Sequence, residues 1–257
     1  MNEIEVKNII ENKSKQVVFV EDTHTYFYAD NKDHLLKSTT ELISNYTIGF
    51  DPDGTILRNT ARRRGITEEE LKEEWELKKN KAAERGTETH AILEKYILNN
   101  CELKGEIEND KAKQGISFLE NLKQKKHFVG FKKILLPEVL VYSRVYDVAG
   151  QIDFIIYNED GSVSLGDWKT NKKPFYYSSD NSKHMLKPLE HIVDNTFNKY
   201  VLQLSTYRFF LESWGIKVKD LFLVQLFADH YDIYPITYFK KEVKNMLKDY
   251  LKKKEAI

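Results

Sequence analysis

The sequence predicts an α/β fold in which helices flank a mixed central β-sheet. Helical patterns dominate residues 39–125, and strand patterns in hairpin succession follow over residues 132–169. One more helix and further strands complete the chain, an order typical of a sheet whose faces are covered by helices. We expect a single domain, with N-terminal strands and a helical segment at 1–84, a core at 85–240 and a C-terminal helix at 241–257.

The N-terminal segment is expected to open with short strands. They are rich in aromatic and β-branched residues, and a turn at Asp22–Thr25 separates the first two. The expected strands are VVFVED at 17–22, TYFYAD at 25–30 and a third near HLLKS at 34–38. This pattern indicates a β-hairpin region ahead of the helices.

Capping residues and glycines mark the helices that follow. Two Ser/Thr-x-x-Glu capping boxes, at residues 38–41 and 67–70, satisfy free backbone N–H groups where helices begin. Gly65 is expected to end one helix, and Gly86 to separate two others. The expected elements are a short helix from Ser38 toward Tyr46, a turn at Asp51–Gly54, and helices at Leu57–Arg64, from Thr67 to near Gly86, at Thr87–Leu98 and at Asp110–Lys123.

Strand patterns dominate the next part of the chain. Two of the strands form a predicted hairpin, because Asn158–Ser162 supplies the Asp-Gly chemistry of a tight turn. The expected strands are Lys132–Leu136, Val139–Tyr146, Gln151–Tyr157 and Val163–Lys169, followed by a loop at Pro174–His191, a helix at Asn195–Trp214, strands at Asp220–Ala228 and near Tyr231–Thr237, and a basic C-terminal helix.

Composition excludes several classes of protein. The 40 basic and 40 acidic residues cancel, so net charge argues neither for nor against nucleic-acid binding. The single cysteine, Cys101, excludes an internal disulfide framework and a four-cysteine zinc or iron–sulfur site within the chain. No apolar run has the length of a transmembrane helix, and the N-terminus lacks a signal-peptide core. We expect a soluble, cytoplasmic protein with no membrane partner.

Charged residues in the predicted hairpin raise the question of a chemical site. Asp167 and Lys169 are two positions apart on one strand and therefore point to the same face. The pair alone is equally compatible with a plain ion pair. Asp153 lies inside an apolar strand, where burying an unpaired carboxylate is costly. Two carboxylates on neighbouring strands are suited to binding a hard divalent cation.

Further motifs accompany the hairpin in a fixed order. Gln203 and Tyr207 are four positions apart and so share one face of a predicted helix. The ordered set is His90 in RGTETH, Glu138 after a proline, Asp153 after a glycine, the triplet Asp167–Trp168–Lys169, and Gln203 with Tyr207. This set resembles the PD-(D/E)XK nuclease superfamily, and within it the RecB-like and lambda-exonuclease-like branch.

The resemblance covers about residues 85–207 and departs from the family in two respects. Ile152 stands where the superfamily has its proline, and the cysteines that hold an iron–sulfur cluster in some relatives are absent. The resemblance implies a restriction-endonuclease-like core with an N-terminal hairpin region and a helical insertion. It also implies one or two Mg²⁺ or Mn²⁺ ions and no iron–sulfur cluster.

The resemblance also assigns roles to residues. Lys169 would hold and polarise the attacking water, while Gln203 and Tyr207 would position the phosphate or an outer-shell water. The implied metal ligands are His90, Glu138, Asp153, Asp167 and the carbonyl oxygen of Trp168; Lys169, Asp153, Asp167, Glu138, Gln203 and Tyr207 are the implied catalytic residues. Simpler interpretations remain open, since His90 alone is typical of a structural residue, Glu138 of an exposed one and Tyr207 of a core residue.

The leading functional interpretation is a metal-dependent DNA exonuclease of repair, recombination or phage-type replication, in a bacterial or phage-infected cell. It would act on single-stranded or duplex ends, with a recombination or replication protein as a further partner. The alternatives are a structure-specific or restriction-like endonuclease of the same superfamily and an inactive nucleic-acid-binding protein.

Basic clusters are the candidates for contacts with DNA. Each cluster alone is also typical of a solvated surface. The helical segment is expected to overhang the metal site and leave a channel that threads one strand, with the clusters at its rim. The predicted nucleic-acid-binding residues are Arg62, Arg63, Arg64, Lys78, Lys79, Lys81, Arg85, Thr170 and Lys172.

Overall fold

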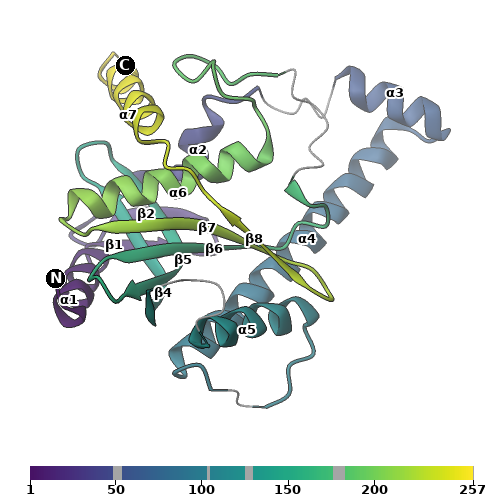
Figure 1. The fold of residues 1–257 in the computed structure, drawn as a ribbon. Coiled ribbons are helices and arrows are strands. Elements are labelled where there is room, and N and C mark those ends of the chain that lie inside the picture. Colours follow the sequence, from purple (N-terminus) through teal and green to yellow (C-terminus); the bar gives the residue numbers. More distant parts are fainter. Residues whose placement is uncertain (49–53, 103–104, 125–129, 176–182, 257) are drawn as a thin grey trace.

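A computed structural model describes residues 1–48, 54–102, 105–124, 130–175 and 183–256. An eight-stranded, mixed, open sheet lies at the centre, and helices flank it (Figure 1). The predicted α/β class and mixed sheet are therefore confirmed. The turn predicted at Asp51–Gly54 and the middle of the loop predicted at Pro174–His191 lie largely outside the described residues.

Strand β5 is the most highly connected strand of the sheet. The strand order is β1-β2-β3-β5-β6-β7-β8, and β4 also pairs with β5. The β3–β5 and β6–β7 pairs are parallel and the other pairs are antiparallel. The strands are β1 (Val17–Val20), β2 (Thr25–Tyr28), β3 (Asn31–Ser38), β4 (Phe131–Ser143), β5 (Val148–Asn158), β6 (Val163–Lys169), β7 (Val218–Leu226) and β8 (Tyr231–Pro235).

Two hydrophobic cores hold the helices against the sheet. One core joins β4–β7 to α1, α2, α6 and α7, and the other joins the sheet to α5 and the C-terminal part of α4. Burial of these apolar side chains is the main driving force for packing helix on sheet. The helices are α1 (Glu3–Ser14), α2 (Thr39–Ser44), α3 (Thr55–Arg64), α4 (Glu68–Leu98), α5 (Asp110–Lys123), α6 (Thr196–Ser213) and α7 (Lys240–Glu255).

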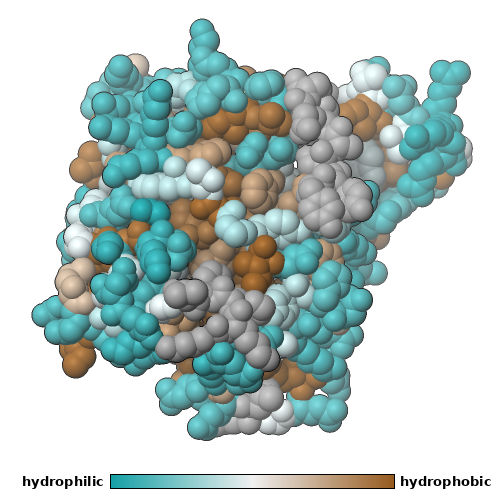
Figure 2. All heavy atoms as spheres, in the orientation of Figure 1, coloured by the Kyte–Doolittle hydropathy of each residue, from teal (hydrophilic) through white to brown (hydrophobic). Residues whose placement is uncertain are grey.

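Figure 2 shows hydrophilic residues over most of the visible face, with hydrophobic residues in scattered places. Among the described helices, none combines the length and the apolar character that crossing a membrane requires.

Three elements differ from the sequence-based expectation. Helix α1 precedes the strands, and its capping box pairs Asn2 with Glu5. Helix α4 runs through Gly86 without a break, because glycine tolerates helical backbone angles at a cost of about 1 kcal/mol. β4 is one strand rather than two. Pro137 is tolerated inside it because, among the described strands, β4 pairs with β5 alone and so has an edge without a strand partner.

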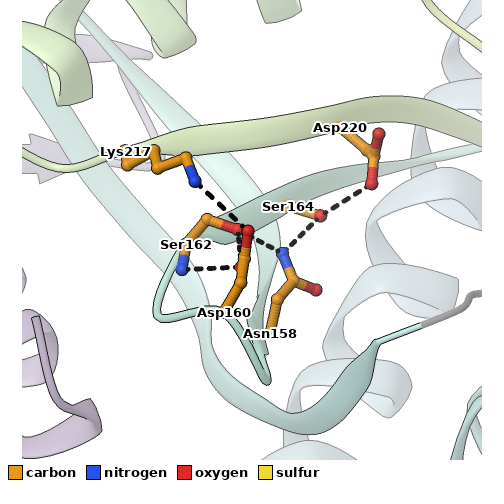
Figure 3. A network of polar contacts seen from close by, with 6 residues as sticks. All are labelled: Asn158, Asp160, Ser162, Ser164, Lys217 and Asp220. Carbon is orange, nitrogen blue, oxygen red and sulfur yellow. Dashed lines mark hydrogen bonds and ion pairs between the residues drawn. The ribbon is translucent and has the colours of Figure 1, made fainter.

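A polar network at the β5–β6 turn fixes the register of this hairpin (Figure 3). The side-chain amide of Asn158 donates to Ser162 Oγ at 3.1 Å and to Ser164 Oγ at 2.9 Å. Asp160 accepts from the Ser162 N–H at 3.1 Å and pairs with Lys217 at 3.2 Å. A slip of one residue would move every side chain of a strand to the opposite face. The network therefore helps to place Asp153 and Asp167 on adjacent strands.

Two glycines provide a test of this packing. A Cβ at Gly166 would lie 2.1 Å from the ring of Phe154, its partner in the β5–β6 register, whereas a Cβ at Gly86 would meet Thr170 Oγ1 at an ordinary 3.5 Å. Gly166→Ala should destabilise the protein by about 1–3 kcal/mol, as overpacking does. Gly86→Ala should stabilise it by about 0.5–1 kcal/mol, because the helix interior loses a glycine. Urea unfolding measures both, and similar effects of the two substitutions would contradict this packing.

Candidate metal centre

Three of the predicted metal ligands converge from three elements. His90 lies on α4, Glu138 on β4 and Asp153 on β5, and one potential ligand atom from each lies within 4.8 Å of the others. The His90 Nδ1 atom is 3.5 Å from Asp153 Oδ2 and 4.0 Å from Glu138 Oε1. Two carboxylates and an imidazole at this spacing form a donor set for a divalent cation.

The β4–β5 register places the two carboxylates opposite each other. Pro137 pairs with Phe154 and Val139 with Ile152, which leaves Glu138 facing Asp153. Glu138 has a φ of 46°, in the left-handed region that a non-glycine residue inside a strand rarely adopts. Such a conformation costs about 1–3 kcal/mol and is found preferentially at functional sites.

Electrostatic crowding at Glu138 favours a bound cation. Burial, followed by the negative charges of Asp153 and Glu94, raises the pKa of the Glu138 carboxyl from 4.5 to about 9. A cation between the carboxylates would remove this repulsion and stabilise the ionised form. The residues present therefore fit a divalent metal ion.

Asp167 and Lys169 form a buried ion pair beside this cluster. Both lie on β6, and Lys169 Nζ is 2.5 Å from Asp167 Oδ2. Burial raises the pKa of the Asp167 carboxyl, and the ammonium of Lys169 opposes that rise. Burial lowers the pKa of Lys169, but Asp167 more than compensates, so its pKa lies above the usual value and Lys169 is an ammonium ion. Asp167 is not one of the three convergent residues, and its role as a metal ligand stays a prediction.

The backbone of Trp168 links the two groups of residues. Its N–H donates to Asp153 Oδ2 at 2.6 Å, which orients that carboxylate toward His90. The indole is buried and stacks on Phe154 with ring centroids 4.3 Å apart. Stacking of this kind holds the strand firmly, so the backbone donor is preorganised. The proposed contact of the Trp168 carbonyl oxygen with a metal stays a prediction.

Tyr200 on α6 holds Lys169 from the other side, and the sequence-based interpretation missed it. Lys169 Nζ lies 4.2 Å from the centroid of the Tyr200 ring, a cation–π contact, and the Tyr200 hydroxyl donates to Asn171 Oδ1 at 3.3 Å. Tyr200 precedes Gln203 by three residues, so both lie on one side of α6. This three-residue spacing is the sequence signal that could have identified Tyr200 as a site residue.

Gln203 and Tyr207 interact with each other on α6. The Gln203 amide donates to Tyr207 Oη at 2.8 Å. The Tyr207 ring lies so close to β5 that a Cβ at Gly150 would be 2.3 Å from its Cε1 atom. Burial is the main cause that raises the pKa of Tyr207 well above its usual value, so the phenol keeps its proton. Gln203 and Tyr207 thus form a neutral hydrogen-bonded pair. The pair packs against β5 at Gly150, three residues before Asp153.

The convergent residues open into a cleft of about 490 Å³. The β1–β2 hairpin forms one wall and α4 the opposite one. The lining residues are Phe19, Glu21, His24, Gly86, Thr87, His90, Ala91, Glu94, Glu138, Gln151 and Asp153. None of the nine predicted nucleic-acid-binding residues is among them, so the basic clusters do not form the walls of this cleft.

Most of the predicted basic residues lie on an arm, defined as α3 together with residues 68–85 of α4. The arm extends away from the sheet (Figure 1). Its side chains Arg62–Arg64, Lys78, Lys79, Lys81 and Arg85 are exposed. Arg64 and Lys78 both pair with Glu74, which partly offsets their charge. Along the helix axis, Lys81 is about 14 Å from His90 at 1.5 Å per residue.

A second group of cations gathers next to β6. Lys111 on α5 donates to the Thr170 carbonyl oxygen at 2.5 Å. Burial, followed by the positive charges of Arg85 and Lys172, lowers the pKa of Lys111. Arg85, Thr170 and Lys172 were predicted to contact nucleic acid, whereas Lys111 was missed because α5 is distant from β6 in the sequence. Three like charges close together are suited to binding an anion.

The raised pKa of Glu138 predicts a pH-dependent stability. Because the folded state binds this proton more tightly than the unfolded state, its contribution is complete below about pH 4.5 and is lost as pH rises toward about 9. In the presence of chelator, the melting temperature of the unaltered protein should therefore fall as pH rises from about 4.5 to about 9. The melting temperature of the Glu138→Gln variant should fall less over the same pH range. Added Mn²⁺ should raise the melting temperature more at pH 9 than at pH 5, since it binds the carboxylate form.

Thermal unfolding across pH measures these effects. The exposed Glu106→Gln is the matched control and should behave as the unaltered protein. Parallel pH profiles for the Glu138→Gln variant and the unaltered protein would contradict the proposed burial of this carboxyl.

Comparison with known proteins adds no family assignment to this geometry. No protein-family model matches the chain, and no curated protein sequence matches it either. The arrangement of His90, Glu138, Asp153 and the Asp167–Lys169 pair is therefore the feature from which a function can be inferred.

Proposed function

We propose that this protein is a divalent-metal-dependent nuclease that hydrolyses phosphodiester bonds in DNA. The observation that carries the proposal is the convergence of His90, Glu138 and Asp153 within 4.8 Å, beside the buried Asp167–Lys169 pair. A metal-ligand set alone would support many reactions. The adjacent buried ammonium ion adds a group that stabilises negative charge, as phosphoryl chemistry requires.

The order of elements supports the family part of the proposal. Along the chain, α4 with His90 precedes β4, β5 and β6 with the acidic residues, and α6 and β7 follow. This is the order that the resemblance to the PD-(D/E)XK superfamily implied for a restriction-endonuclease-like core. We assign the chain to the RecB-like and lambda-exonuclease-like branch of that superfamily as part of the same proposal.

Mg²⁺ or Mn²⁺ held by His90, Glu138 and Asp153 would supply an activated water and charge stabilisation at the phosphate. The imidazole favours Mn²⁺ over Mg²⁺, because nitrogen ligands suit transition metals. The Trp168 N–H fixes the orientation of Asp153. The protein would thus contribute to metal binding a set of closely spaced ligands, one of which is already oriented by a backbone hydrogen bond.

Lys169 has an electrostatic role in this proposal. Because Asp167 keeps it charged, it acts as an ammonium ion that orients water and offsets developing negative charge, and not as a general base. Tyr200 is a positioning residue, since its ring face holds the ammonium group 4.2 Å from the ring centroid.

The cations beside β6 supply contacts for the DNA backbone. Thr170 follows directly after Lys169, the last residue of β6. The side chains of Arg85, Lys111 and Lys172 gather beside it. A phosphate bound there would lie near the scissile one, since both sites flank the end of the same strand. Such contacts give affinity that does not depend on base sequence.

The roles can be separated by two readouts, metal binding and cleavage. Cleavage of labelled DNA should require Mg²⁺ or Mn²⁺ and stop in chelator. Asp153→Asn and Asp167→Asn should each abolish cleavage, the first with a clear loss of Mn²⁺ affinity in calorimetry. Lys169→Ala should abolish cleavage and leave Mn²⁺ affinity largely intact. Tyr200→Leu should lower kcat at least tenfold, a loss of about 1.4 kcal/mol or more, while Tyr200→Phe keeps the ring and most of the activity.

Lys217→Ala is the matched control for Lys169, because Lys217 lies just before β7 and pairs with Asp160 in the remote β5–β6 turn (Figure 3). Its loss leaves in place the hydrogen bonds of Asn158 and Asp160 that hold the turn itself. The Lys217→Ala variant should cleave as the unaltered protein does. Full cleavage in chelator would refute the metal-dependent mechanism. Equal loss of metal binding in the Asp153 and Lys169 variants would refute the division of roles.

The same assay distinguishes the alternatives. A closed circular single strand and a linear one of the same sequence separate an exonuclease, which we favour, from an endonuclease. Metal binding without cleavage of either substrate would point to an inactive nucleic-acid-binding protein.

Salt dependence tests the cations beside β6. In an equilibrium binding assay, affinity for DNA should fall steeply with salt for all sequences, because cations on the protein displace counterions from phosphates. Lys111→Met should weaken binding equally across sequences and reduce the salt slope by about one. Lys113→Met, on the exposed side of the same helix where it pairs with Asp110, is the control. An unchanged slope in Lys111→Met would exclude a phosphate contact there.

A further inference from the structure

The cleft has an aromatic wall that metal chemistry does not use. Phe19 on β1 and His24 in the β1–β2 turn line the side of the cleft that faces α4. The Phe19 ring stacks on Tyr26 with centroids 4.6 Å apart and meets the edge of His24 at 5.8 Å. Tyr26 is buried, whereas Phe19 is half-buried and His24 is exposed. The buried Tyr26 ring thus supports the Phe19 ring, and the rings of Phe19 and His24 are accessible from the cleft.

His24 is held in place rather than free. Its Nδ1 atom lies 2.6 Å from the carbonyl oxygen of Glu21. Because a carbonyl oxygen only accepts, Nδ1 carries the proton and the ring orientation is fixed. The aromatic wall is therefore preorganised, which reduces the entropic cost of binding a flat ligand.

The charges around the cleft determine which part of a nucleotide this wall can bind. Four carboxylates line the cleft, and no lysine or arginine is among its described lining residues. Without a cation, a phosphate would be repelled from the hairpin side. A neutral, flat ring would not be repelled, and it would gain stacking on the aromatic faces. The carboxylates are Glu21, Glu94, Glu138 and Asp153.

The aromatic wall continues beyond the metal site. Phe19 and His24 also line a neighbouring cleft of about 410 Å³, where Tyr26 joins them. The same rings therefore border two hollows, one that contains His90, Glu138 and Asp153 and one that does not. A strand could pass from one to the other along the ring faces.

We propose that Phe19 and His24 form a stacking subsite for an unpaired nucleobase next to the scissile phosphate. The inference rests on the proposed nuclease function and narrows its substrate to single-stranded or frayed ends. A paired base is excluded because its faces are already stacked in the duplex. Because every base has a π-face, the subsite tolerates any sequence.

A matched set of substrates and variants tests the subsite. A short single-stranded oligonucleotide carries one abasic residue at each position in turn. With the unaltered protein, one position should show about a tenfold rise in KM, as loss of one base stack predicts. Phe19→Leu, which keeps an apolar side chain against Tyr26, should raise KM about tenfold on the intact oligonucleotide. The same variant should be insensitive to the abasic residue at that position, because the stacking partner is already gone.

Phe227→Leu is the matched control. Phe227 stacks on His230 at the β7–β8 turn with centroids 4.4 Å apart, and neither residue lines the cleft. This variant should keep the KM of the unaltered protein and its sensitivity to the abasic position. Circular dichroism and unfolding curves show whether both variants fold.

A binding readout separates this inference from the nuclease proposal. A 2-aminopurine at the sensitive position, or at each position in turn, loses fluorescence when it stacks, and Ca²⁺ can replace Mn²⁺ in this measurement. Quenching by the unaltered protein but not by Phe19→Leu supports the subsite even if no cleavage occurs. Cleavage by the unaltered protein with equal KM and equal quenching in Phe19→Leu and Phe227→Leu would overturn the subsite and leave the nuclease proposal standing.

Discussion

Strand β5 hydrogen-bonds to β3, β4 and β6, and this three-way pairing determines where the chemical groups lie. Its pairing with β4 brings Glu138 opposite Asp153, and its hairpin with β6 brings Asp167 and Lys169 alongside. Because side chains alternate between the two faces of a strand, a shift of one residue in either register would separate these groups. The polar network at the β5–β6 turn and the stacking of Trp168 on Phe154 hold one register from both ends.

Although the net charge is zero, negative and positive side chains are concentrated in two separate places. Carboxylates crowd the cleft beneath the β1–β2 hairpin, whereas Arg85, Lys111 and Lys172 gather next to the end of β6. Lys169 lies at the boundary, paired with Asp167 and covered by Tyr200. A cation is attracted to one side and a polyanion to the other. In the proposed function, a phosphodiester would reach a bound metal ion at this boundary.

Much of the fold followed from local sequence signals. The Ser38 N-cap located α2, the Thr67–Glu70 capping box located the start of α4, and the Asp-Gly turn located the β5–β6 hairpin. The same kind of signal at Asn2 and Glu5 marks the start of α1, a helix that the sequence-based interpretation missed. Gly86 did not end a helix: α4 continues through it, and the Thr89 hydroxyl donates to the Arg85 carbonyl oxygen inside the same helix.

The candidate site was predictable only in part. His90, Glu138 and Asp153 were expected together because their order along the chain resembled a known pattern, and the structure places them together. Lys111 and Phe19 were missed because their partners are distant in sequence, and Tyr200 was missed although its spacing from Gln203 places both on one side of α6. Such contacts depend on how α5, α6 and the β1–β2 hairpin dock on the sheet, and helix or strand periodicity carries no information about docking.

The continuity of α4 has a mechanical consequence. Its 31 residues form a single rod about 46 Å long, with His90 near the point where the rod rests on the sheet and the arm at its free end. A rod that tilts about its support displaces its tip far more than its fulcrum. Any tilt of α4 about its packed C-terminal part would therefore displace the arm far more than His90, whose imidazole would stay close to Asp153.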